Sequence, residues 1–100
     1  MKTKTLPEHK TIDALSDFFK IFGDPTRIRI IWVLMQSERY VHEISEILEM
    51  SPSAVSHQLR ILRQGHIVKH RRNGRHILYS LDDSHVEDIF EKGISHIEHI

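Results

Sequence analysis

The sequence predicts a mainly helical fold with one β-hairpin (α+β), in the order α-α-α-α-β-β-α. Apolar residues recur at three- and four-residue intervals in five segments, as they do on one face of a helix. Two of these segments begin with a capping residue followed by proline, Asp24-Pro25 and Ser51-Pro52. Two strand-like runs flank Asn73-Gly74, which is a strong hairpin signal. A length of 100 residues suits a single domain.

The first half of the chain contains three predicted helices. Residues 1–10 are expected to form a flexible arm, and residues 11–100 the folded domain. Helices are predicted at about residues 11–22, 25–35 and 41–48, whereas the polar residues before Val41 are typical of a turn. The apolar residues on these helices are Leu15, Phe18, Phe19, Phe22, Ile28, Ile31, Met35, Val41, Ile44, Ile47 and Leu48.

The fourth helix, predicted from Ser51 to Gln64, has two different faces. Val55, Leu59 and Leu62 fall within about 40° of one another and are expected to face the core. The opposite side is small, polar and basic, and it consists of Ser53, Ser56, His57 and Arg60. This outer face is a candidate surface for reading DNA bases.

The second half continues with two strands and a last helix. Strands are predicted at residues 67–71 and 75–79, with the turn around Asn73-Gly74. Residues 82–100 form the last predicted helix, with Asp82 or Asp83 as its cap.

The zero net charge of the chain hides a strong charge polarity. Residues 51–81 contain no acid and six cations, whereas residues 82–100 carry six acids and one lysine. The six cations are Arg60, Arg63, Lys69, Arg71, Arg72 and Arg75. Because they coincide with one helix face and the hairpin, they indicate a surface that binds phosphates, such as those of DNA.

Composition argues against several other classes of protein. The chain has no cysteine, so disulfides and thiolate metal sites are excluded. It has no apolar run long enough to span a membrane, and its first residues do not form a signal peptide, so we expect a cytoplasmic protein. It has no glycine-rich phosphate loop, no nucleophile beside a base and no paired carboxylates, so we expect neither an enzyme nor a small-molecule substrate.

The ends of the last predicted helix carry four candidate metal ligands: Asp83 and His85 at its start, and His96 and His99 at its end. Asp83 and His85 converge only if Asp83 lies in the non-helical cap. In a regular helix, residues two positions apart point about 200° away from each other around the axis. His96 and His99 are three residues apart and should share a face. One oxygen and three nitrogens form a tetrahedral set that suits Zn(II) and also Co(II).

A single helix cannot bring these two pairs together. His85 and His96 stand roughly 16 Å apart along the helix axis, whereas a zinc–nitrogen bond measures only about 2.0–2.1 Å. Two antiparallel copies of the helix can place His85 of one chain beside the two later histidines of the other. The spacing therefore predicts a homodimer with metal sites between its subunits.

The order of elements, with a capped polar helix directly before a basic hairpin, describes a winged helix-turn-helix. The chain also resembles the ArsR/SmtB family of bacterial metal-responsive repressors over about residues 11–100. The resemblance is carried by residues 23–30 (Gly-Asp-Pro-Thr-Arg-Ile-Arg-Ile), by residues 53–62 (Ser-Ala-Val-Ser-His-Gln-Leu-Arg-Ile-Leu), and by the wing at Arg72-Asn73-Gly74-Arg75 and Tyr79-Ser80-Leu81. The final Asp-x-His and His-x-x-His resemble the subgroup that senses zinc or cobalt through its last helix.

This resemblance implies a homodimeric repressor that zinc or cobalt releases from palindromic operator DNA. The expected DNA contacts are Ser53, Ser56, His57, Arg60, Arg71, Arg72 and Arg75. Family members that sense cadmium, lead or arsenic place cysteines on the third helix, but residues 39–43 here read Arg-Tyr-Val-His-Glu. The site on the last helix is therefore expected to be the only one.

For the link between metal and DNA, we expect the free ring N–H of His96, or of His99, to donate to a carbonyl near Gln64-Gly65-His66, where the fourth helix ends. Three alternatives remain open. The chain could be a family member without a metal signal, a nickel or cobalt sensor that adds His9 as a ligand, or a metal-storage or metal-chaperone protein.

Overall fold

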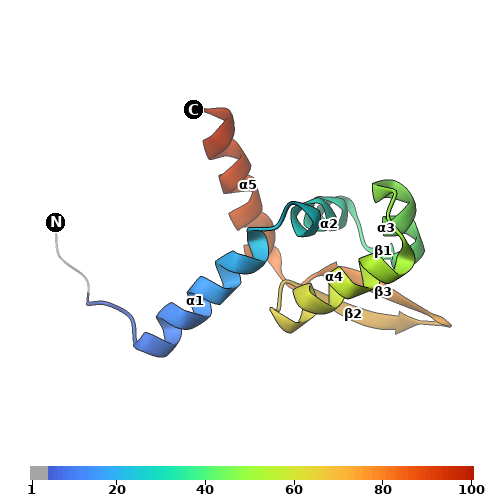
Figure 1. Cartoon of the computed structure of the whole chain (residues 1–100), viewed down its shortest axis with the longest axis horizontal. Coiled ribbons are helices and arrows are strands. Elements are labelled where there is room, and N and C mark those ends of the chain that lie inside the picture. The colour runs from blue at the N-terminus through green and yellow to red at the C-terminus, as the bar shows by residue number, and fades with distance from the viewer. Residues whose placement is uncertain (1–4) are drawn as a thin grey trace.

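The computed structural model describes residues 5–100, in which five helices and three strands follow one another. They are α1 (His9–Phe22), α2 (Pro25–Gln36), β1 (Arg39–Tyr40), α3 (Val41–Leu48), α4 (Pro52–Gln64), β2 (Val68–Asn73), β3 (His76–Leu81) and α5 (Ser84–Glu98). The predicted helices and hairpin are confirmed, with the addition of β1. Figure 1 shows α1 projecting away from the body that α2, α3, α4 and the hairpin form.

The predicted capping residues begin their helices. At the start of α2, the Asp24 carboxylate accepts a hydrogen bond from the backbone N–H of Arg27 (3.0 Å). At the start of α4, the Ser51 hydroxyl accepts one from Ala54 (3.1 Å). Helix α1 begins at His9, two residues before the predicted Thr11, so only residues 5–8 of the expected arm precede it in the described part. Residues 1–4 of that arm lie outside the described residues.

The sheet is antiparallel, with strand order β1-β3-β2. Arg39 pairs with Tyr79 and Tyr40 with Leu78, although the sequence had indicated a turn before Val41. A two-residue strand has no alternation of its own, so only its partner β3 reveals it. The hairpin turn also differs by one residue: Asn73 pairs with His76, which leaves Gly74-Arg75 as the loop. Gly74 takes the positive φ (66°) that such a two-residue loop requires.

The core lies where α2, α3 and α4 meet the sheet and the start of α5. Its fully buried side chains are Ile30, Ile31, Ile44, Val55, Leu59, Leu62, Ile67 and Val68. The prediction for the inner face of α4 is confirmed. For α2 the prediction was partly wrong, because Ile28 remains 38% exposed while its neighbours Ile30 and Ile31 are buried. Helix α2 is packed on more than one side, so a single apolar stripe does not describe it.

Helix α1 packs little of its surface into this core, and no residue of α1 is buried. Its apolar side chains Leu15 and Phe19 are about half exposed, as is a row on α5 that includes Ile89 and Ile97. None of the helices within residues 5–100 is long and apolar enough to cross a membrane.

Candidate metal centre and nucleic-acid interface

The outer face of α4 carries the residues predicted to read DNA. Ser53, Ser56, His57 and Arg60 are all exposed, while the opposite face of the helix is anchored in the core. The Ser51 cap and the proline at the first position fix where α4 begins. The helix therefore presents a polar, basic ridge that is free to enter a groove.

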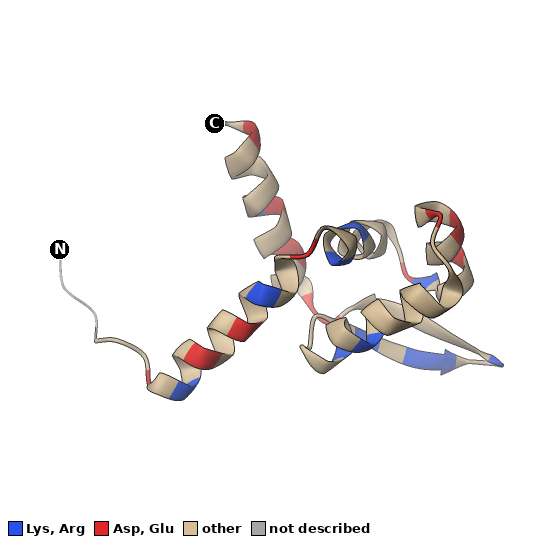
Figure 2. Cartoon of the chain, viewed as in Figure 1, with Lys and Arg blue, Asp and Glu red and all other residues tan. Residues whose placement is uncertain are grey.

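The predicted wing cations are exposed on the hairpin. Figure 2 shows basic residues gathered on α4, β2 and the hairpin tip, whereas acidic residues recur on α3 and α5. Arg72 and Arg75 are exposed. Arg71 differs from them, because its guanidinium donates to the carboxylate of Glu38 at 3.1 Å. Part of the charge of Arg71 is therefore already matched within the chain.

Sequence reasoning missed an aromatic cluster beside the turn of the wing, where Asn73 pairs with His76. The ring of Tyr40 lies 5.7 Å from that of His42 and 5.6 Å from that of His76, and the two imidazoles are 6.1 Å apart. The Tyr40 hydroxyl accepts a hydrogen bond from the Asn73 amide at 2.6 Å. The cluster joins β1 and the start of α3 to the hairpin. Its only signal in the sequence is the pair Tyr40 and His42, which is too weak to place His76 beside them.

At the start of α5, Asp83 and His85 come together. Asp83 is the N-cap, with extended backbone angles, and its carboxylate accepts a hydrogen bond from the backbone N–H of His85 (2.8 Å). The same Oδ1 lies 3.2 Å from Nδ1 of His85. This contact with the His85 side chain lowers the pKa of the Asp83 carboxyl below its ordinary value, so the group is a carboxylate at neutral pH. The cap conformation removes the divergence that a regular helix would impose.

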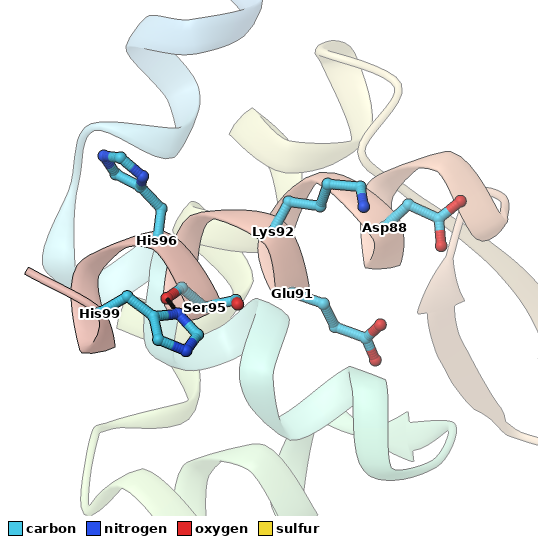
Figure 3. A pocket seen from close by; sticks show the side chains of 6 residues that line it. All are labelled: Asp88, Glu91, Lys92, Ser95, His96 and His99. Atoms are coloured by element: carbon cyan, nitrogen blue, oxygen red, sulfur yellow. Dashed lines mark hydrogen bonds between the residues drawn. The ribbon is translucent and has the colours of Figure 1, made fainter.

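At the other end of α5, His96 and His99 do not yet converge. Figure 3 shows their rings on opposite sides of the helix ribbon, around a hollow that Asp88, Glu91, Lys92 and Ser95 also line. His99 is the C-cap residue, and its Nδ1 lies 2.6 Å from the carbonyl oxygen of Ser95. Its Nε2 is the nitrogen that this bond leaves for other partners. Both residues are exposed.

The two pairs of candidate ligands stand at opposite ends of α5 in a single chain. Accordingly, residues 5–100 of one chain contain no group of three or more metal-binding side chains close enough to hold an ion. The distance argument from the sequence, in which a second chain completes each site, stays a prediction.

One expectation about another histidine, His9, needs correction. His9 belongs to the first turn of α1 and lies 3.7 Å from the Asp13 carboxylate, so it is not on a free arm. The expected bond from His96 or His99 to a carbonyl at residues 64–66 stays a prediction; in the single chain, Nδ1 of His99 lies beside the carbonyl of Ser95 instead. His66 itself follows the end of α4 with a positive φ of 59°.

An apolar hollow lies between α1, α2 and α5. It is lined by Phe19, Phe22, Ile28, Ile89, Ile94 and Ile97. Exposed apolar surface of this kind, continuous with the uncovered stripe of α1, usually marks a protein interface.

The sequence matches the arsR family of bacterial regulatory proteins over residues 24–70, from the cap of α2 into β2. A transcriptional repressor SmtB homologue from Synechocystis is 39% identical over 95 residues, which cover 92% of this chain and 72% of that protein. A cadmium resistance transcriptional regulatory protein CadC homologue from Staphylococcus aureus is 37% identical over 93% of this chain and 77% of that protein.

Among solved structures, the homodimeric winged helix-turn-helix DNA-binding domain of a Mycobacterium bovis protein superposes with a TM-score of 0.87. The two chains are 25% identical, and the match covers 100% of this chain and 94% of the other. The fold predicted from the sequence, a winged helix-turn-helix, is thereby confirmed.

Proposed function

Because this chain belongs to the arsR family of bacterial regulatory proteins, we propose that it is a homodimeric repressor that zinc, or cobalt, releases from palindromic operator DNA. Its relatives are transcriptional regulators rather than enzymes. The two parts of the proposal that belong to this chain alone are its metal ligands and its DNA contacts.

The observation that carries the metal proposal is the arrangement at the two ends of α5. The cap geometry brings an ionised carboxylate and an imidazole within 3.2 Å at one end. Two exposed imidazoles occupy the other end. An antiparallel second copy would supply the missing pair at each end, which gives two equivalent sites in the dimer.

The donor set fits the proposed ion. Asp83 and His85 of one subunit, with the partner subunit's His96 and His99, offer one oxygen and three nitrogens, a composition typical of tetrahedral zinc sites. Bound there, the ion supplies a cross-link between the two copies of α5. His99 would keep its Nδ1 on the Ser95 carbonyl and present its Nε2 to the ion. The bond to Ser95 would then fix the tautomer and the orientation of the ring.

The second copy is expected to cover the apolar hollow and the stripe of α1. Both surfaces are exposed in the single chain, and the Mycobacterium bovis domain that shares this fold is a homodimer. In such a dimer, α4 of each subunit faces one half of a two-fold symmetric operator. Ser53, Ser56 and His57 would contact base edges, and Arg60 with the wing arginines would contact phosphates.

The choice of metal follows from the ligands that this chain lacks. One relative is named for cadmium resistance, and soft ions of that kind favour thiolate ligands. This chain has no cysteine, and Tyr40 and His42 stand at the start of α3 instead. Imidazole and carboxylate suit zinc and cobalt, so the site on α5 is the one proposed to respond.

The decisive experiment measures DNA affinity of the same protein with and without Zn(II). Duplexes selected by the metal-free protein from random-sequence DNA serve as the probe, and fluorescence anisotropy reports binding. Zinc is expected to weaken binding by about 5–150-fold, the range of typical allosteric couplings. Because the coupling is reciprocal, the same duplex must weaken zinc binding by the same factor.

Variants separate the proposed ligands from the other histidines. His85→Ala should abolish the response to zinc, whereas His9→Ala should leave it intact. Co(II) should give the intense visible bands of a tetrahedral site without sulfur charge transfer. An octahedral spectrum, or the absence of a response in His9→Ala, would favour the alternative of a nickel or cobalt sensor with ligands from α1.

A further inference from the structure

Arg27 lies on α2, and its guanidinium hydrogen-bonds to both α1 and α4, so it joins three elements of the structure. Its Nε donates to the carbonyl oxygen of Ile21 at 2.9 Å, and one terminal nitrogen lies 3.5 Å from the carbonyl of Lys20. The other terminal nitrogen donates to the side-chain oxygen of Gln58 at 3.2 Å. The first two acceptors end α1, and Gln58 belongs to α4. The side chain is only 17% exposed, and its bonds to Ile21 and Gln58 are partly buried.

A second contact joins the same two helices nearby. Ile21, near the end of α1, packs against Gly65 at the end of α4, where a Cβ on residue 65 would lie only 2.1 Å from Cδ1 of Ile21. The backbone of Gly65 has a φ of −86°, which any residue can adopt, so a larger residue is opposed only by this close approach. Cδ1 of Ile21, which is packed against the core, would have to move to admit it. Together with the Arg27–Gln58 bond, it gives α1 two separate points of attachment to α4.

Gln58 is poorly placed to read DNA itself. It lies about 60° around α4 from Val55, which is fully buried, and on the flank of the helix away from Ser56 and Arg60. Its side chain is half-buried, and its amide oxygen already accepts one hydrogen bond from Arg27. The residue therefore orients α4 rather than contacting bases.

We infer that Arg27 and Gln58 are positioning residues that set the angle and spacing of the two α4 helices in the dimer. The inference rests on the proposed homodimer, in which α1 lies at the subunit interface. Because α1 would be fixed by the partner, the Arg27–Gln58 bond and the Ile21–Gly65 contact transmit that fixed position to α4. Releasing them should let α4 move relative to the two-fold axis without altering the contacts of α4 with its own core.

The test measures the separation of the α4 helices directly. Since the chain has no cysteine, Ser56→Cys provides a single spin-labelling position on the exposed face of α4. Pulsed electron-spin distance measurements on the DNA-free dimer then report the label–label separation across the two-fold axis. In Gln58→Met, which keeps the shape of the side chain but not its acceptor, the distribution should broaden or shift by about 1–2 Å or more, the usual size of helix displacements at subunit interfaces.

Two controls distinguish positioning from a general loss of structure. Gln64→Met makes the same change at an exposed residue of the same helix and should leave the distribution unchanged. Labels at Asp88→Cys on α5 should report the same separation with and without Gln58→Met. An α4 distribution in Gln58→Met that matches the parent would overturn the role of the Arg27–Gln58 bond, and a parallel change on α5 would show a loosened dimer instead.

The second contact is tested by a pair of compensating changes. Gly65→Ala introduces the overlap with Cδ1 of Ile21 and should shift the α4 distribution, whereas adding Ile21→Val removes that atom and should restore it. A shift that Ile21→Val does not reverse would mean that the alanine acts elsewhere. An unchanged distribution in Gly65→Ala would mean that this contact does not set the position of α4.

A DNA measurement extends the test to function. A duplex selected by the parent dimer is resynthesised with one base pair added or removed between its half-sites. The parent should prefer the original spacing, and in Gln58→Met the ratio of the two affinities should fall towards one; an unchanged ratio would contradict the inference.

If sedimentation shows a monomer, or if no duplex is selected, the proposed function fails. If the parent behaves as proposed and only the Gln58→Met results disagree, the inference alone fails.

Discussion

Asp83 combines a structural task with a proposed chemical one. As the N-cap of α5 it accepts a backbone hydrogen bond, and its contact with Nδ1 of His85 orients the imidazole. The same carboxylate is proposed to be the one oxygen ligand of the metal. Capping requires only an acceptor, whereas the metal site benefits from the negative charge. Substitutions can therefore separate the two roles.

Asp83→Asn should preserve the cap and weaken the metal site. Asparagine caps helices about as well as aspartate, so the free energy of unfolding of the metal-free protein should change little, mostly through the helix dipole. Asp83→Ala should lower that free energy further, because it removes the acceptor as well. Thermal unfolding checks stability, and calorimetric titration checks zinc affinity, which should fall in both variants. Unchanged zinc affinity in Asp83→Asn would remove Asp83 from the ligand set.

The histidines of α5 show what spacing can and cannot predict. The interval between His96 and His99 places their Cα atoms on one face, but His99 is the C-cap residue, and its ring turns to the free carbonyl of Ser95. Helix ends leave several carbonyls without partners, so a terminal histidine has acceptors close at hand. The sequence identifies candidate ligands, whereas their rotamers depend on local partners and on a second chain.

His96 remains the better candidate for transmitting the metal signal, because Ser95 already holds the ring of His99. The sequence predicts that its non-ligating nitrogen donates to a carbonyl near His66; the single chain does not make that bond, so it would have to form on dimerisation or metal binding. Replacing His96 by a histidine methylated on that nitrogen should leave zinc bound but abolish release of DNA. Calorimetry and anisotropy report the two effects separately. Full release of DNA by zinc in this variant would mean that coupling runs through the dimer packing.

At the scale of whole elements, local signals predicted most of the fold. Asp24 and Ser51 marked the starts of α2 and α4, and Asn73-Gly74 between two strand-like runs predicted the hairpin. What the sequence could not reveal were features set by distant partners. The strand β1 exists because Arg39 and Tyr40 pair with β3, and the partner of Arg71 lies 33 residues away at Glu38. Neither leaves a periodic pattern in the chain.

The wing cations should differ in their contribution to DNA binding. Each arginine–phosphate pair releases about one counterion on binding. Arg72→Ala should therefore reduce the slope of log affinity against log salt concentration by about 1. Arg71→Ala should reduce it less, since Glu38 competes for that guanidinium. Glu38→Gln should strengthen binding to any duplex, because it releases Arg71 without touching the wing. Affinities measured across a series of salt concentrations check all three, and zinc affinity should stay unchanged. Equal slopes for the two arginine variants would show that the Glu38 pair opens on DNA.

At the scale of the whole molecule, the charge polarity divides the chain by task. The acid-free segment of residues 51–81 contributes α4 and the hairpin, whereas residues 82–100 contribute the acidic α5. Acidic surface on α5 would repel DNA and would also lower the free energy of cations held nearby. The two proposed binding functions therefore occupy regions of opposite sign, and the apolar surface of α1 and α5 is left for the second subunit.

Because each proposed metal site draws its ligands from two chains, disrupting the dimer should abolish tight zinc binding even when every proposed ligand is intact. Leu15→Asp places a charge in the exposed apolar stripe of α1. Leu15 itself is about half exposed in the single chain. Burying an unpaired carboxylate in an interface is unfavourable by several kcal/mol, so the variant should be a monomer. Ser16→Asp, on the next residue but another face of the same helix, is the matched control and should stay dimeric.

Sedimentation velocity reports the assembly and calorimetry the zinc affinity. In the Leu15→Asp variant, zinc affinity should recover as protein concentration rises, because the ion then drives association. A monomer that binds one zinc as tightly as the parent would place the site within a single chain and remove the reason for an intersubunit site.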